Sequence, residues 1–233
     1  MASIHHTDGP CGHLVLVAKP VVPGRVKTRL IGPLTALEAA EVHRLMLQCV
    51  LERLADSVAD TGHGLVLALD GTCGAAARTL DLPAAWRVID QGPGDLGERM
   101  AGIWSCLGGG PAAFFGADCP DVPRPALRSA VAAMARPGAS IGPTEDGGYW
   151  TLAASGPVPA LLSGIDWGTP SVYHQTREAA RRGGIAITDL DHWADVDTHE
   201  DLQALRRRLM DQDEPVLVRL RAGLDRLHRE SRP

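Results

Sequence analysis

Residues 14–35 read LVLVAKPVVPGRVKTRLIGPLT, the pattern of a strand, a loop and the start of a helix. Residues 14–18 form an uninterrupted apolar run, as in a strand that is covered on both faces. The run stops at Lys19-Pro20, and a loop rich in Gly, Pro and basic residues follows. Thr35, with Glu38 three residues later, is typical of a capping box. The stretch therefore predicts a buried strand that leads through a long loop into a helix.

The same alternation recurs along the rest of the chain. Apolar runs predict further strands at 65–69, 86–89, 112–116 and 185–190, with two more inside 139–155. Helical spacing of apolar residues predicts helices at 74–80, 96–107, 125–135, 170–182, 199–210 and 215–229. Strands that alternate with helices favour an α/β fold, a three-layer sandwich around a mostly parallel central sheet.

Length and composition favour one domain. The chain has 233 residues, of which 45% are apolar, enough for one substantial core. Residues 1–12 are polar, lack the apolar core of a signal peptide and are expected to be a flexible arm before a single domain at 13–233. The last helix, at about 214–230, carries an apolar stripe that is more typical of packing on its own domain, although a homodimer contact is the alternative.

Charge and cysteine spacing exclude several classes of protein. The net charge is −5 with both signs mixed along the chain, which weighs against a nucleic-acid or membrane partner. The five cysteines form no Cys-x-x-Cys pair, and no run reaches membrane-spanning length, so a reduced, cytoplasmic compartment is expected. The turn after the first strand lacks G-x-G-x-x-G, which disfavours a Rossmann oxidoreductase.

Ligands of an open parallel sheet bind beyond the carboxyl ends of its strands. The loop after the first strand holds both lysines of the chain and suits several phosphate oxygens, although a simply solvated loop is the alternative. Its candidate residues are Lys19, Gly24, Arg25, Lys27, Thr28 and Arg29. Asp118 and Asp197, which follow later strands, are hard oxygen ligands suited to Mg²⁺ or Mn²⁺ bound with substrate phosphates. Their alternative role is to cap the segments that follow them.

Two further glycine-containing stretches follow predicted strands. Residues 90–97 include Gly92, Gly94 and Gly97, a pattern that turns also use freely. Residues 145–150, Glu145, Asp146, Gly147, Gly148, Tyr149 and Trp150, read either as a hairpin turn whose aromatic rings enter the core or as the lining of an acceptor pocket.

The order of six segments resembles a family of small transferases with the glycosyltransferase-A, nucleotide-diphospho-sugar transferase fold. That family is named rSAM/selenodomain-associated transferase 1, or arsenosugar-biosynthesis-type glycosyltransferase. The segments are AKPVVPGRVKTRL, QGPGDLGERM, FFGADCPDVP, IGPTEDGGYW, IDWGTPSV and DVDTHEDL, and they span roughly residues 14–205. KTRLIGPLT is also similar to a stretch of sugar-nucleotide pyrophosphorylases, and GADCPD with DVDTHEDL to blocks of phospholactate guanylyltransferases.

The resemblance implies roles for individual residues. Arg25, Lys27 and Arg29 would contact the nucleotide phosphates, and Asp118 and Asp197 would hold the metal ion. Gln91, Gly94, Leu96 and Gly97 would border the nucleotide, and residues 145–150 would meet the acceptor, with Lys27, Arg29, Asp118 and Asp146 as the catalytic set. The signature L-x-G-G-x-x-x-R-x-G of molybdenum-cofactor nucleotidyltransferases is absent, because Lys19-Pro20 stands at its paired glycines.

Three functional hypotheses follow. The first is metal-dependent nucleotidyl transfer from a nucleoside triphosphate to a small acceptor that bears a phosphate or phosphonate, and the sequence slightly favours it. The second is glycosyl transfer from a nucleotide sugar to a small-molecule acceptor, with Glu145 or Asp146 as acid, base or hydroxyl anchor. The third is a non-catalytic nucleotide-binding module, which the two intact carboxylates disfavour.

Overall fold

A computed structural model describes residues 10–71 and 80–230 of the chain. Its strands are β1 (His13–Ala18), β2 (Gly64–Leu69), β3 (Trp86–Asp90), β4 (Ala112–Gly116), β5 (Ala139–Pro143), β6 (Tyr149–Ala154) and β7 (Ile187–Asp189). Its helices are η1 (Thr28–Leu30), α1 (Ala36–Ser57), α3 (Leu96–Cys106), α4 (Arg124–Ala133), α5 (Pro159–Leu162), α6 (Val172–Gly183), α7 (His199–Arg208) and α8 (Pro215–Glu230). The short helix expected at 74–80 falls almost entirely outside the described residues.

The seven described strands form one sheet in the order β3-β2-β1-β4-β6-β5-β7. All neighbouring pairs are parallel except those of β6, which runs antiparallel to β4 and β5. The mostly parallel sheet expected from the sequence is therefore confirmed. The strand order reverses at β1, because β2 and β3 lie on one side of it and β4 on the other. This switch point lies where open α/β sheets bind their ligands.

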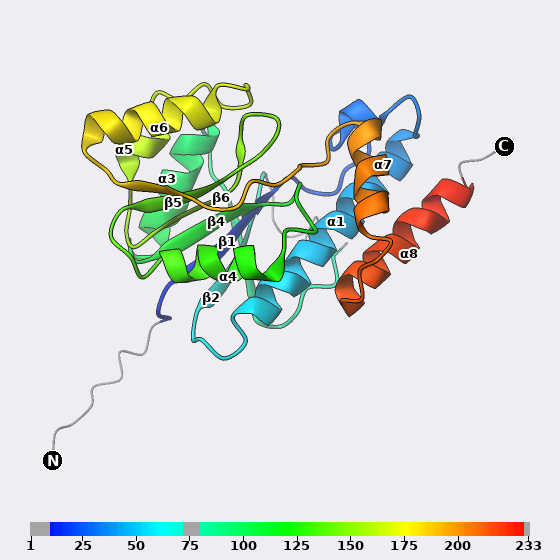
Figure 1. The fold of residues 1–233 in the computed structure, drawn as a ribbon, viewed down its shortest axis with the longest axis horizontal. Coiled ribbons are helices and arrows are strands. Elements are labelled where there is room, and N and C mark those ends of the chain that lie inside the picture. The colour runs from blue at the N-terminus through cyan, green and yellow to red at the C-terminus, as the bar shows by residue number, and fades with distance from the viewer. Residues whose placement is uncertain (1–9, 72–79, 231–233) are drawn as a thin grey trace, which may run out of the picture.

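Two layers of helices cover the sheet (Figure 1). On one face, Leu47 and Leu51 of α1 and Leu127 of α4 pack on side chains of β1, β2 and β4. On the other face, Met100 and Trp104 of α3, together with α5 and α6, cover the side chains that point the opposite way. The core is thus split by a sheet that is apolar on both faces, as its continuous apolar runs predicted.

The C-terminal helices pack on the outer side of α1 (Figure 1). The Thr35 capping box begins α1 as expected, with the Thr35 hydroxyl accepting from the Glu38 amide. Met46 and Cys49 of α1 contact the stripe of α8 that includes Leu217, Leu220 and Leu224. The stripe therefore packs on its own domain.

Two details differ from the expected boundaries. The strand predicted at 185–190 is the shorter β7, because Gly184 ends α6 in the left-handed conformation and the Ile185 amide still bonds the Ala180 carbonyl. The single turn α5 was not predicted, since four residues carry no periodicity. None of the described helices has the length and apolar character needed to cross a membrane.

Candidate active site

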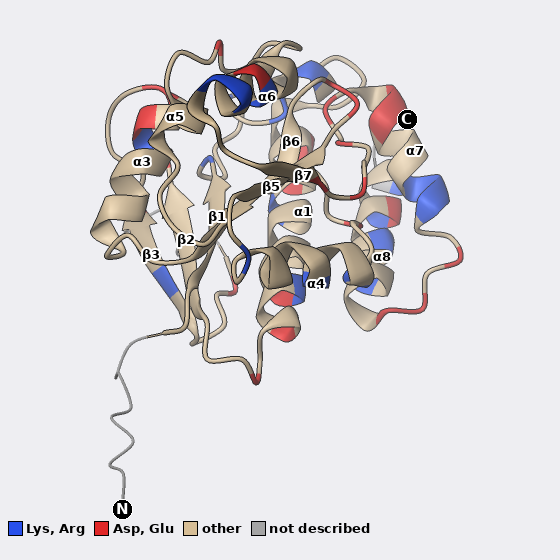
Figure 2. Ribbon diagram, turned by 60° about the vertical axis from the view of Figure 1, so that its left-hand side comes forward, with Lys and Arg blue, Asp and Glu red and all other residues tan. Residues whose placement is uncertain are grey.

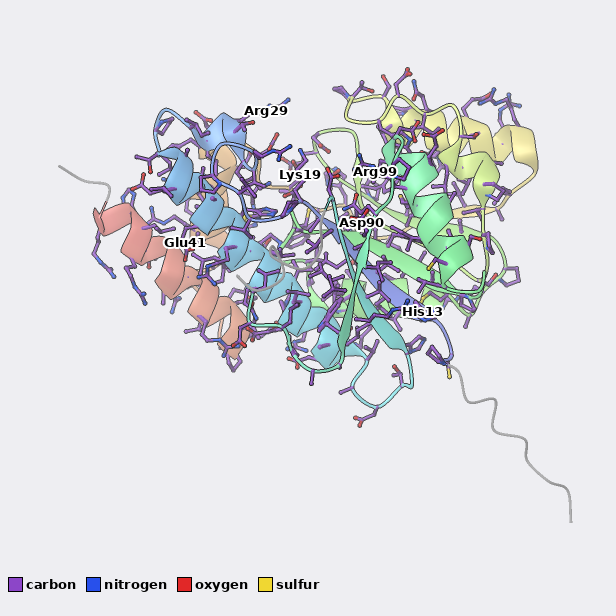
Figure 3. The ribbon with its side chains drawn as sticks, turned by 180° about the vertical axis from the view of Figure 1, so that it is seen from behind. His13, Lys19, Arg29, Glu41, Asp90 and Arg99 are labelled. Carbon is purple, nitrogen blue, oxygen red and sulfur yellow. The ribbon has the colours of Figure 1, made fainter. Side chains whose placement is uncertain are left out.

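The parallel register aligns the carboxyl ends of four strands at one edge of the sheet. Ala18 of β1 pairs with Leu69 of β2, which in turn pairs with Asp90 of β3, and Gly116 of β4 pairs with Val17. The four segments that follow these strand ends therefore begin close to one another. The labelled side chains of Lys19, Arg29 and Arg99 lie along this edge, and His13 at the start of β1 lies away from it (Figure 3).

Lys27 stands at the centre of this edge. Its ammonium group bonds the carboxylate of Asp118 and the carbonyl of Val196, and it lies 4.0 Å from Oδ1 of Asp197. Arg29 Nη1 donates to Asp197 Oδ2 over 2.6 Å. Residues from three distant segments, 27–29, 118 and 196–197, therefore meet as the sequence predicted.

The backbone fixes the two carboxylates relative to each other. The Val196 amide donates to the Asp118 carbonyl over 3.0 Å, so the loop after β4 and the segment before α7 run side by side. Thr198 is the N-cap of α7 and shares a capping box with Asp201. Asp197 directly precedes this cap, and its own carboxylate points to the cations. The capping role belongs to Thr198 and Asp201.

Charge holds Asp118 in its ionised form. Burial alone would raise the pKa of Asp118, but the charge and hydrogen bond of Lys27 hold it below its ordinary value. Its side chain is nevertheless 55% exposed, and that of Asp197 is 38% exposed. Both carboxylates can therefore accept a further cation from the solvent side.

A cavity of about 450 Å³, here called the strand-end pocket, opens at the carboxyl ends of β1 and β4. Of the predicted site residues, its lining includes Lys19, Lys27, Gln91, Leu96, Asp118, Tyr149, Trp150 and Asp197. Two lining residues that the sequence did not single out are Asp70 and Arg99, whose side chains pair over 3.1 Å. Arg99 also donates to the Gly94 carbonyl over 2.8 Å. Only the fold, which places helix α3 beside the end of β2, brings this pair together.

A second cavity of about 580 Å³, here called the hairpin pocket, lies beside the β5–β6 hairpin. Its lining includes Lys19, Arg29, Leu96, Asp118, Asp146, Gly148, Tyr149, Trp150, Trp167, Asp195 and Asp197. Lys19, Leu96, Asp118 and Asp197 line both cavities, so the two cavities meet at the carboxylate pair. The site is thus a pair of pockets with the cations and carboxylates at their junction.

The hairpin pocket is acidic. Partial burial raises the pKa of Asp195 to about 6, and the negative charges of Asp146 and Asp118 add to the rise. Asp146 is held in its turn, where its Oδ1 accepts from the Thr144 hydroxyl and the Gly148 amide. Acidic positions mark several loops between β6, β7 and α7 (Figure 2). Asp195 was not among the predicted site residues, although it lies two positions before Asp197.

Several predicted residues line neither pocket. Gly24 and Arg25 are exposed on the loop before η1, Thr28 is exposed at the start of η1, and Glu145 is exposed at the hairpin tip. Gly94, with φ +99°, and Gly147, with φ +86°, occupy turns. Gly97 allows close packing, because a Cβ there would lie 1.9 Å from the Leu162 carbonyl oxygen.

Gln91 has a structural role in addition to its place in the strand-end pocket. Its Nε2 donates to the carbonyls of Ala18 and Ala68, each over 2.9 Å. Both amide hydrogens are therefore used by the ends of β1 and β2, and the side-chain oxygen of Gln91 accepts from Arg99 Nη1 over 3.3 Å.

A divalent ion fits the donor set of this site. Asp118 and Asp197 already converge on one positive group, the ammonium of Lys27, and both expose carboxylate oxygens. Within the described part of the chain, no three His, Cys, Asp or Glu side chains gather as a metal site. Two carboxylates with substrate phosphate oxygens and water match the way Mg²⁺ is usually held.

Comparison with known proteins gives the chain a family and a set of structural neighbours. A family described as "Uncharacterized protein conserved in bacteria (DUF2064)" matches residues 53–169, half of the chain. A structure described as a "putative nucleotide-diphospho-sugar transferase" from Desulfovibrio desulfuricans G20 is 26% identical, with a TM-score of 0.80 over 95% of this chain and 98% of that chain.

Two more distant structures share the fold alone. A cytidylyltransferase from Leptospira borgpetersenii serovar Hardjo-bovis strain JB197 is 14% identical, with a TM-score of 0.53 over 95% of this chain and 96% of that one. CMP:2-keto-3-deoxy-manno-octonic acid synthetase complexed with CTP is 13% identical, with a TM-score of 0.53 over 87% and 99%. No curated protein matches the chain. The nucleotide-diphospho-sugar transferase fold is therefore confirmed.

Proposed function

The chain belongs to the DUF2064 family, and we propose that it is a metal-dependent glycosyltransferase that uses a nucleotide sugar. Its structural neighbours are sugar-nucleotide and nucleotidyl transferases, so the chain is a transferase. The same proposal includes membership of the narrower family that the sequence resembles, the rSAM/selenodomain-associated small transferases.

One observation carries the proposal. Asp118, Asp197, Lys27 and Arg29 meet at the junction of two pockets, each large enough for part of a substrate. A nucleotide sugar has the matching layout, with a nucleoside at one end, a sugar at the other and a diphosphate between them. We place the nucleoside in the strand-end pocket, the diphosphate at the junction, and the sugar and acceptor in the hairpin pocket.

The metal ion has a defined place in this proposal. Asp118 and Asp197 would hold it, together with oxygens of the diphosphate. When bound, a divalent ion supplies Lewis acidity that stabilises negative charge on the departing phosphate oxygen. Lys19 and Arg29, which line the hairpin pocket beside these carboxylates, would neutralise the remaining charge of the diphosphate.

The walls of the hairpin pocket favour a sugar over a phosphate-bearing acceptor. Its four aspartates, 118, 146, 195 and 197, outnumber Lys19 and Arg29, and Arg29 is already paired with Asp197. A phosphate entering this pocket would meet like charge. The partly buried rings of Tyr149 and Trp167 offer apolar contact to a sugar face, and Asp146 and Asp195 offer acceptors to its hydroxyl groups.

The chemistry of transfer then follows. The bond between the anomeric carbon and the diphosphate oxygen breaks, and a bond to the acceptor oxygen forms. The proton of the acceptor hydroxyl passes to a carboxylate of the hairpin pocket, for which Asp146 is our candidate. Lys19 and Arg29 stabilise the leaving diphosphate.

Nucleotidyl transfer from a nucleoside triphosphate is the second candidate. The observation that favours it is the concentration of positive charge at the junction, with Lys19, Lys27 and Arg29 within one loop. The four aspartates of the hairpin pocket count against it, because they would repel an acceptor that bears a phosphate.

Product analysis separates the two. The protein is incubated with Mg²⁺ and either a panel of nucleotide sugars or the nucleoside triphosphates, and the released phosphates are resolved by anion-exchange chromatography. We expect slow release of a nucleoside diphosphate from one nucleotide sugar, with water as the acceptor. Release of pyrophosphate from a triphosphate, with no turnover of any nucleotide sugar, would contradict glycosyl transfer and support the second candidate.

A further inference from the structure

Lys27 occupies the place where the proposed function needs a metal ion. Its ammonium group bonds Asp118 and the Val196 carbonyl and lies 4.0 Å from Asp197. An ammonium has three hydrogens to donate, and two of them are used by Asp118 and the Val196 carbonyl. With its side chain 4% exposed, Lys27 in this arrangement presents little surface to the strand-end pocket that it lines.

The ammonium and a divalent ion compete for the same carboxylates. Two positive groups on one pair of carboxylates would repel each other strongly at such short range. When Lys27 gives up Asp118, its buried charge needs another anionic partner, because an unpaired buried charge is strongly unfavourable. Lys27 also lines the strand-end pocket, so the diphosphate at the junction is the partner within reach.

The backbone of Lys27 is consistent with a residue that moves. Lys27 has φ 46° and ψ 43°, and it is the one non-glycine residue with positive φ in the described ranges. Residues other than glycine rarely adopt this left-handed backbone conformation, and they keep it only where surrounding contacts impose it. Release of Asp118 would remove one of the contacts that impose it.

We propose that Lys27 is an exchangeable counter-cation: it holds Asp118 and Asp197 together in the ligand-free protein and transfers to the diphosphate when the metal ion binds. The proposal rests on the proposed function for the identity of these two ligands. It makes their binding cooperative, because each ligand favours the same displaced position of Lys27. Such coupling is reciprocal and typically amounts to about 5–150-fold in affinity.

The two lysines of the chain allow a direct test on the unmodified sequence. Protein labelled with ¹⁵N at the lysine side chains gives two ammonium resonances, and Lys19→Arg assigns them. Mg²⁺ alone, pyrophosphate alone and both together are then added, with calorimetry to establish saturation. We expect the Lys27 resonance to shift strongly only when both are present. An unchanged Lys27 resonance at saturation with both ligands would overturn the exchange.

Metal affinity gives a second test, with Mn²⁺ followed by electron paramagnetic resonance. Lys27→Met removes the competitor, so we expect Mn²⁺ alone to bind about tenfold more tightly than in the wild type, and pyrophosphate to add little. Arg25→Met removes the same charge from an exposed residue of the same loop that lines neither pocket, and it is expected to keep the coupling. A purely structural Lys27 would instead give weaker Mn²⁺ binding in Lys27→Met.

The outcomes distinguish the two proposals. If the wild type binds neither Mn²⁺ nor Mg²⁺ with pyrophosphate, the proposed function fails and the exchange fails with it. If both bind, but independently and with Lys27 unmoved, only the exchange fails. If Lys27→Met does not fold, the ¹⁵N resonance experiment on the wild-type chain still tests whether Lys27 changes its partner.

Discussion

The ammonium group of Lys27 bonds the carboxylate of Asp118, although 91 positions separate the two residues in the sequence. This contact joins the loop after β1 to the loop after β4, the two strands between which the sheet reverses its order. The cations and carboxylates are therefore parts of one site. The following predictions test which residues of that site carry out the chemistry and which hold it in place.

Asp118→Asn is expected to lower metal-dependent turnover at least about 100-fold, because it removes the charge of the main metal ligand. Circular dichroism should show the same fold, with a lower unfolding midpoint because Lys27, 4% exposed, loses its charged partner. Asp189→Asn is the matched control, because Asp189 is an exposed carboxylate that pairs with Arg177 on the far side of β5 from the site. Equal turnover in the two variants would place the metal ion elsewhere.

Arg29→Ala should weaken nucleotide binding by about 1.5–3 kcal/mol if Arg29 donates a charge-assisted hydrogen bond to the diphosphate. Arg25→Ala, four positions earlier on the same loop, should have a much smaller effect, because Arg25 is exposed and lines neither pocket. Calorimetric titration with the preferred nucleotide measures both. The same loss in both variants would mean that the loop acts only through its total charge.

Gly97→Ala should destabilise the protein by about 1–3 kcal/mol, because the new methyl group would collide with the Leu162 carbonyl. Gly102→Ala is the matched control in the same helix, where a Cβ meets no atom within 4 Å. There alanine should stabilise the helix by about 0.5–1 kcal/mol. Urea unfolding compares the two, and a neutral result for Gly97→Ala would show that α5 can shift away.

Glu214→Gln should lower the free energy of unfolding by about 3 kcal/mol at pH 7, because it leaves Arg53 buried without its partner. Arg53 also donates to the Pro120 carbonyl over 2.8 Å, so the loss would reach the loop that carries Asp118. Glu178→Gln, at an exposed pair with Arg181, should leave the unfolding midpoint unchanged.

The effect of Glu214→Gln should also depend on pH. Burial would raise the pKa of Glu214, but hydrogen bonds and charge from Arg53 and Arg124 hold it below its ordinary value of 4.5. A lowered carboxyl pKa gives stability that is present above the unfolded-state pKa and is lost as pH falls through the folded-state pKa. The difference between wild type and variant should therefore stay constant above about pH 5 and shrink below pH 4.5. A difference that does not change with pH would exclude ionised Glu214 as the source.

The sequence was sufficient to predict the strands with long apolar runs and the helices with caps. Residues 14–18 and 65–69 show a buried strand directly, and Thr35 with Glu38 marks the start of α1. The antiparallel position of β6 between β4 and β5 could not be predicted, because strand order depends on tertiary contacts. The strand β7 begins later than expected because Gly184 and the Ile185 amide still close α6, a local detail that apolar periodicity does not reveal.

The sequence predicted which residues form the site better than it predicted which of them contact one another. The sequence placed Lys27, Arg29, Asp118 and Asp197 at one sheet edge, and they do lie together. It assigned Lys27 to a phosphate, which stays a prediction, and it gave no sign that the ammonium bonds Asp118 and the Val196 carbonyl, since those contacts depend on the fold. Asp195 carried a signal, an acid after the last strand, but its raised pKa comes first from burial and then from Asp146 and Asp118, which lie 49 and 77 positions away.

The most direct test is an anomalous difference map from crystals grown with Mn²⁺ and the nucleoside diphosphate that the protein prefers. We expect one strong Mn²⁺ peak coordinated by Asp118 and Asp197 and by the diphosphate, with the nucleoside in the strand-end pocket. A Mn²⁺ peak that touches neither carboxylate, or a nucleotide bound away from this junction, would contradict the assignment of the site.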